Sequence, residues 1–135
     1  MIGYKVVNRI YEDGCYKDVS CNENFTANSA LRLDYKDNEI VIAPQGTMGI
    51  FIFLKKADAI RFKKINDKWK LKKVELLSRP MKVTKKVHFG YSKILIETSF
   101  SKKMYKNYLD KESIFAPRGT YVCRKIRVIK DVKEA

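Results

Sequence analysis

The spacing of apolar and polar residues along this chain predicts strands more often than helices. Tyr4 to Ile10 and Cys15 to Ser20 are rich in strand-forming residues, and they enclose the pair Asp13-Gly14. An Asp-Gly pair tolerates the positive φ angles that a tight hairpin turn requires. We therefore predict that the two segments form an antiparallel hairpin.

Further strands are predicted along the rest of the chain. Gly49 to Leu54 is a continuous apolar run and is expected to be the central strand. Along Lys68 to Ser78, Trp69 and Leu71 fall on one side and lysines on the other, which predicts that Trp69 lies in the core. The other strands are expected at Leu31–Tyr35, Glu39–Ala43, Met81–Phe89, Lys93–Glu97 and Tyr121–Ile129.

Two segments have the composition of short helices. Lys55 to Ile65 lacks Gly and Pro and is rich in helix formers, and Ser99 to Leu109 is apolar at every fourth residue from Phe100 to Tyr108. Because strand follows strand over most of the length, the sheet should be largely antiparallel. The sequence thus predicts one α+β domain over residues 1–135, with two short helices and a sheet of eight or nine strands that is either open or curled toward a barrel.

Charge is distributed unevenly along the chain, whose net charge is +14. Lys55 to Lys86 holds thirteen basic and three acidic residues, whereas Tyr11 to Glu39 holds seven acidic and three basic ones. A basic surface of this kind attracts polyanions such as nucleic acid. Lysine also outnumbers arginine, and Asn, Ile and Tyr are frequent. Codon bias in an AT-rich genome therefore remains a second explanation of the charge.

Several lysines of the basic segment are candidates for contacting phosphate groups. Residues two apart on a strand share a face, so Lys68, Lys70 and Lys72 should lie together. No aromatic side chain for base stacking is identified beside them, because Trp69 alternates to the opposite face. The pattern predicts contact with nucleic acid or a phosphorylated ligand, and the alternative is a solvated lysine-rich surface. The candidate residues are Lys56, Lys63, Lys64, Lys68, Lys70, Lys72, Lys82 and Lys86.

One local motif occurs twice. Residues 35–47 and 108–120 share Tyr, Asp, Glu, Ala, Pro, Gly and Thr at a constant offset of 73. The motif is typical of a turn, a short strand and a second turn, in which Pro fixes φ and Gly permits the reversal. It is interpreted either as a recurring strand connection or as two turns that flank one site and bind an anion through backbone N–H groups. The turn residues are Pro44, Gly46 and Thr47 in the first copy and Pro117, Arg118, Gly119 and Thr120 in the second.

The residues that common enzyme mechanisms need are scarce. His88 is the only histidine, and the sequence holds no glycine-rich phosphate loop and no clustered carboxylates. The cysteines, Cys15, Cys21 and Cys123, lack the clustered spacing of a zinc site. We therefore assign no catalytic residue, metal or cofactor, and the sequence favours a binding protein over an enzyme. It contains no apolar stretch long enough to span a bilayer and does not start with a signal peptide, so a cytoplasmic location without a membrane partner is expected.

Residues 31 to 62 resemble small α+β proteins of phages and large DNA viruses. The resemblance consists of Tyr35, the run Gly49-Ile50-Phe51-Ile52-Phe53 and Ala59 in the following helix. It implies no activity, but it suggests an alternative function, that of an interaction module that inhibits a host enzyme. The same strand and helix are also similar to the ADP-ribosyltransferase-like fold. Arg9 and the run Glu97-Thr98-Ser99 do not have the spacing of that family's functional residues.

Overall fold

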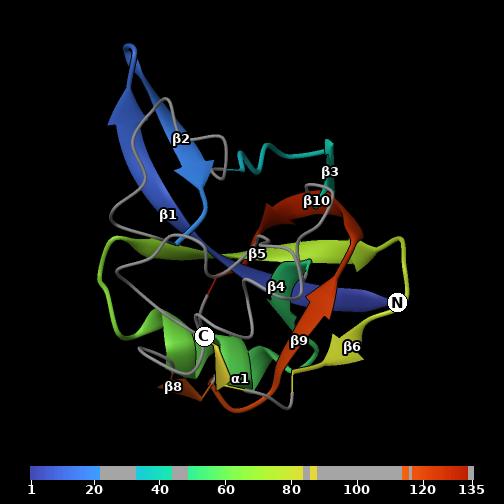
Figure 1. Cartoon of the computed structure of the whole chain (residues 1–135). Helices are drawn as coiled ribbons and strands as arrows, with labels where there is room; N and C mark the ends of the chain where they lie inside the picture. Colours follow the sequence, from blue (N-terminus) through green and yellow to red (C-terminus); the bar gives the residue numbers. More distant parts are fainter. Residues whose placement is uncertain (22–32, 44–48, 84–85, 88–113, 116, 134–135) are drawn as a thin grey trace.

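The computed structural model describes residues 1–21, 33–43, 49–83, 86–87, 114–115 and 117–133. Within these residues the chain forms ten strands and one helix, an α+β architecture (Figure 1). Eight strands belong to one antiparallel sheet in the order β3-β10-β5-β1-β4-β9-β6, with β2 beside β1, and β7 and β8 form a separate pair. The bounds are β1 Ile2–Glu12, β2 Cys15–Val19, β3 Ile40–Ile42, β4 Ile50–Phe53, α1 Lys56–Lys63, β5 Trp69–Leu76, β6 Met81–Lys82, β7 Lys86–Val87, β8 Ile114–Phe115, β9 Thr120–Cys123 and β10 Lys125–Asp131.

Strand β1 organises the sheet. One of its edges pairs with β5 from Ile2 to Asn8, while the other edge pairs with β4 at Tyr4 and with β2 from Asn8 onward. The predicted hairpin is confirmed, and its turn residues Asp13 and Gly14 have φ angles of 52° and 82°. In Figure 1 the hairpin extends away from the other strands, so its far end presents side chains to solvent.

The sheet buries apolar side chains on both of its faces. Val7, Val74 and Val128 face one core, which also holds Tyr35. The opposite face is covered by α1, the one described helix, whose Ala59 packs there with Trp69. The predicted central strand is confirmed as β4, all four residues of which are buried, and the predicted core position of Trp69 is confirmed by an exposed fraction of 7%. Burial on both faces explains why β4 is uniformly apolar.

The segment Tyr121–Ile129, expected as one strand, is divided into β9 and β10 at Arg124. The Ser78 hydroxyl accepts hydrogen bonds from the backbone N–H groups of Arg124, at 3.0 Å, and of Lys125, at 3.1 Å. These bonds satisfy backbone groups that leave the strand ladder at the corner. The chain can therefore change partners there, from β4 and β6 to β5 and β3.

Other expectations have mixed outcomes. The predicted helix Lys55–Ile65 is found as α1, and Met81–Phe89 contains the two short strands β6 and β7. At Leu31–Tyr35 the described residues contribute a single bridge, between Val19 and Asp34. The described strands leave the sheet open, with β3 and β6 at its ends, so a closed barrel is not found among them.

The predicted strand Lys93–Glu97 and the predicted second helix Ser99–Leu109 lie outside the described residues. A search of the described part of the chain found no helix with the length and apolarity needed to cross a bilayer.

Candidate nucleic-acid interface

Five charged side chains form a cluster where the hairpin meets the body of the sheet. The Lys72 ammonium lies 2.9 Å from the Asp18 carboxylate, 2.7 Å from Asp37 and 2.9 Å from Asp131. The Arg9 guanidinium donates two hydrogen bonds to Asp18, at 2.7 and 3.0 Å, and one to Asp131, at 2.8 Å. Lys72 is only 3% exposed. We call these residues the charge cluster.

Strand register brings the charge cluster together. Asp18 pairs with Arg9 across β1 and β2, and Asp131 pairs with Lys72 across β5 and β10. Asp37 lies in the turn that follows Tyr35, whose backbone N–H donates to the Asp18 carbonyl at 2.8 Å. The cluster therefore joins residues of the acidic segment to a residue of the basic segment.

Ion pairing favours the charged forms of Arg9, Lys72, Asp18 and Asp131. Burial disfavours the charged form of Lys72, but its hydrogen bonds to Asp37, Asp18 and Asp131 outweigh burial and raise its pKa. Hydrogen bonds to Asp18 and Asp131 likewise raise the pKa of Arg9. Burial opposes ionisation of Asp18 and Asp131, yet hydrogen bonds from Arg9 and Lys72 lower the pKa of both carboxyls. Lys72 thus has an internal role, although sequence alternation placed it on the phosphate-binding face.

Beside the charge cluster is an open depression with a volume of about 560 Å³. It is lined by the paired Arg9 and Asp18, by the exposed Lys68 and Lys70 of the β5 region, and by Tyr16 of β2. Pairing of Val7 with Lys70, and the hydrogen bond from Arg9 N–H to the Lys68 carbonyl at 3.4 Å, place these residues along one face. We call this feature the basic depression.

An exposed aromatic pair borders the basic depression. Tyr16 is 73% exposed and Tyr11 is 66% exposed. Their ring centroids lie 5.1 Å apart with an interplanar angle of 72°, an edge-to-face contact. Sequence reasoning did not include these tyrosines in the site. The signal was present, because a two-residue turn at Asp13-Gly14 places Tyr11 opposite Tyr16.

The eight candidate lysines do not form one surface. Lys68 and Lys70 line the basic depression. Lys82 lies on the edge strand β6. Lys86 lies on β7, and the structure describes its backbone but not its side chain. The other candidates are the buried Lys72 and three lysines at α1, namely Lys56, Lys63 and Lys64.

The described copy of the repeated turn is internally bonded. Thr120 donates from its backbone N–H and from its hydroxyl to the Pro117 carbonyl, at 3.1 and 2.6 Å. Gly119 has a φ of 85°, and the Asp58 carboxylate of α1 occupies the space where a side chain at position 119 would begin. The N–H of Thr120 is therefore used within the turn rather than presented to an anion. Pro44, Gly46 and Thr47 of the first copy lie outside the described residues, and Arg118 is exposed.

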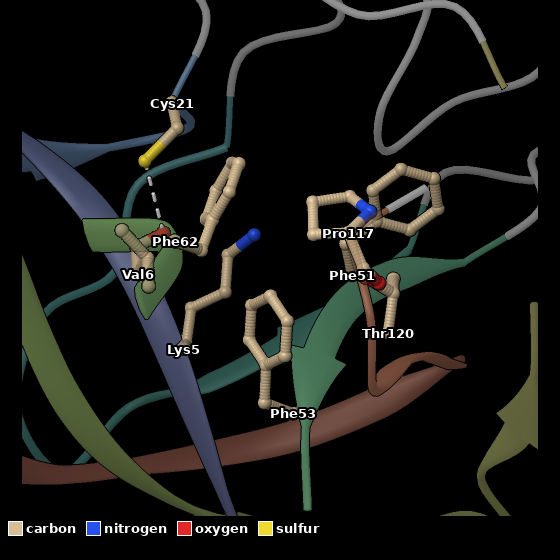
Figure 2. A pocket seen from close by; sticks show the side chains of 8 residues that line it. All are labelled: Lys5, Val6, Cys21, Phe51, Phe53, Phe62, Pro117 and Thr120. Atoms are coloured by element: carbon tan, nitrogen blue, oxygen red, sulfur yellow. Dashed lines mark hydrogen bonds between the residues drawn. The ribbon is translucent and has the colours of Figure 1, made fainter. Parts of the chain in front are cut away.

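A second, small cavity is lined in part by the buried Lys5 of β1, which pairs with Lys72 of β5. Figure 2 shows the Lys5 side chain extending toward Pro117, beside Phe53 and Phe62. The Lys5 ammonium lies 5.2 Å from the centre of the Tyr35 ring. The cavity volume of about 10 Å³ corresponds to about one water molecule, which is too small for an organic ligand. Its lining consists of Lys5, Val6, Cys21, Phe51, Phe53, Phe62, Pro117 and Thr120.

Among the described residues no group of three or more His, Cys, Asp or Glu side chains is arranged to hold a metal ion. Comparison with known proteins found no matching family model, no matching curated protein and no matching solved structure.

Proposed function

We propose that this protein binds nucleic acid through the basic depression, with Lys68 and Lys70 contacting phosphate groups. The observation that carries the proposal is the position of these two exposed lysines beside one open depression. Within the described part of the chain neither ammonium is held in an ion pair, in contrast to Arg9 and Lys72. Both lysines are therefore available to an external anion.

The charge cluster supports this use of the basic depression. Unpaired, Asp18 would present a negative charge to the depression and repel phosphate. Its carboxylate is paired with Arg9 at 2.7 Å and with Lys72 at 2.9 Å, and the five groups of the cluster, two cations and three carboxylates, together carry a formal charge of −1, which the two ammonium groups of Lys68 and Lys70 outweigh. Lys68 and Lys70 then determine the sign of the potential over the depression.

The test measures affinity for a fluorescein-labelled oligonucleotide by anisotropy as salt concentration is varied. Replacing Lys68 and Lys70 together by Glu should lower affinity by about tenfold or more at low salt. It should also make the plot of log affinity against log salt shallower by about 1.4 for a single strand, because each lost phosphate contact contributes about 0.7.

The matched control is the double replacement of Lys36 and Lys125 by Glu. Both lysines are exposed and lie outside the basic depression, so the control changes net charge by the same amount. It should retain most of the affinity and the salt slope of the wild type. An equal loss in both variants would mean that bulk charge, rather than the basic depression, determines binding.

A protein-interaction module is the second candidate function, and strand β3 favours it. Among the described strands β3 pairs only with β10, so its other edge is free for strand addition. Ile40 and Ile42 on this edge strand are exposed. This function predicts a complex with a host protein that survives nuclease treatment and is lost when both isoleucines are replaced by Lys. Recovery of nucleic acid alone would count against it.

A further inference from the structure

Tyr11 and Tyr16 form an aromatic surface that serves neither core. Both rings are mostly exposed, and they contact each other at 5.1 Å near the end of the hairpin. The edge-to-face contact restrains the orientation of each ring. Exposed, oriented aromatic rings are the side chains on which single-stranded nucleic acids stack their bases.

Tyr16 and the two lysines lie on opposite sides of β1, the strand that holds Tyr11. Tyr16 belongs to β2, while Lys70 belongs to β5, and both strands pair with β1. Neighbouring strands lie about 4.8 Å apart, so β2 and β5 are about 10 Å apart at Asn8, the one residue of β1 that pairs with both. Tyr16 and Lys70 are also offset along the strand direction, because they lie beside Tyr11 and Val7 of β1, and both line the basic depression with Lys68. An aromatic side chain on one side and two cations on the other match the two components of a nucleotide, its base and its phosphate.

We propose that the ligand of the basic depression is a single nucleic-acid strand, one base of which stacks on Tyr16 while its phosphates contact Lys68 and Lys70. This inference rests on the proposed function and adds that the nucleic acid is single-stranded. Tyr11 supports the Tyr16 ring through their edge-to-face contact. Stacking needs no particular base, so binding is tolerant of sequence.

The charge of the hairpin favours a single strand over a duplex. In a duplex the base faces are stacked on one another, and a protein ribbon reaches the bases only by entering a groove. Two-stranded ribbons fit the major groove, but the end of this hairpin carries Glu12 and Asp13. The Lys17 ammonium lies 3.3 Å from the Glu12 carboxylate and 3.5 Å from the Asp13 carboxylate. From Tyr11 to Lys17 the hairpin end holds two carboxylates and one ammonium, a formal charge of −1, which the phosphates lining a groove repel.

The experiment compares four labelled probes by anisotropy at one low salt concentration. They are a DNA strand of about twelve nucleotides, within the usual site sizes of single-strand binders, the RNA strand of the same sequence, the matching duplex and an abasic strand of the same length. We expect at least one of the two single strands to bind more tightly than the duplex and the abasic strand. The abasic strand retains the phosphates, so its loss of affinity measures stacking.

The variant Tyr16→Ala should weaken binding of the single strand by about five- to 150-fold, the range measured for loss of one base–aromatic stack. Tyr16→Phe keeps the ring and should bind as the wild type does. Because Tyr16 is 73% exposed, neither change removes core packing, and circular dichroism verifies the fold of both variants.

Three results would overturn the inference: duplex binding as tight as that of both single strands, equal binding of the abasic and normal strands, or unchanged affinity in Tyr16→Ala. If the Lys68 and Lys70 double variant still loses affinity in that case, the proposed function stands and only the stacked single strand is refuted. If the wild type binds none of the four probes at low salt, the proposed function itself fails.

Discussion

Replacement of Lys72 by Met tests the energetic role of the charge cluster. The substitution keeps most of the length of the side chain but removes its charge, which leaves Asp18, Asp37 and Asp131 with one cation, Arg9, within the cluster. Removing one partner of a buried ion pair costs about 3–5 kcal/mol. Asp37 and Asp131 are each 49% exposed and can be rehydrated, so we expect the low end of this range, about 3 kcal/mol. The melting temperature should fall by about 10 °C.

Urea unfolding provides the assay, because Trp69 is the only tryptophan and is buried, so its fluorescence reports the loss of the core. The matched control is Lys70→Met, two residues away on the same face of β5 but exposed. It should change the free energy of unfolding by less than about 0.5 kcal/mol. A double-mutant cycle with Asp18→Asn should give a coupling energy of about 1 kcal/mol or more. If Lys72→Met costs no more than Lys70→Met, the charge cluster does not stabilise the fold and this reasoning is wrong.

Two further predictions concern pH and backbone geometry. The pKa values of Asp18 and Asp131 are lowered from 3.8 in the folded protein, so their stabilisation is complete above about pH 4 and is lost as pH falls through the lowered values. Urea midpoints measured between pH 7 and pH 2 should therefore drop at the acid end, and Asp18→Asn should flatten the drop; an unchanged profile in that variant would contradict the assignment. Gly119→Ala should destabilise the protein by about 1–3 kcal/mol, because it combines a positive φ with overlap at the Asp58 carboxylate. Gly14→Ala, at a similar φ but in open space, should cost about 1 kcal/mol, and equal unfolding midpoints for the two variants would exclude the overlap as a cause.

Local signals were sufficient to predict several elements. The Asp13-Gly14 pair predicted the hairpin, the apolar run predicted β4, and alternation predicted that Trp69 is buried. In each case the conformation depends on residues within the element itself, so no contact with a distant segment had to be known. The tyrosine pair followed from the same turn, but its proximity to Lys68 depends on the pairing of β1 with β5, which no local pattern indicates.

The burial of Lys72 has a tertiary cause. Alternation assigned Lys70 and Lys72 to one face of a strand, which β5 confirms, but one face can extend from solvent into the interior. Lys72 is buried because carboxylates from β2, from β10 and from the turn after Tyr35 surround it. The division of Tyr121–Ile129 into two strands also depends on a residue distant in the sequence. The Ser78 hydroxyl stabilises the corner at Arg124 by accepting hydrogen bonds from the backbone there.

The position of β10 has a consequence for the order in which the protein can fold. This strand follows every other described strand in the sequence, yet it lies inside the sheet between β3 and β5. During synthesis β3 therefore lacks its described strand partner until Arg127 has left the ribosome, whereas the hairpin pairs only residues close in the sequence and can form earlier. Such long-range pairing slows folding and leaves strand edges open to other chains in the meantime. Nascent chains shortened before β10 should bind chaperones, whereas chains that include it should not.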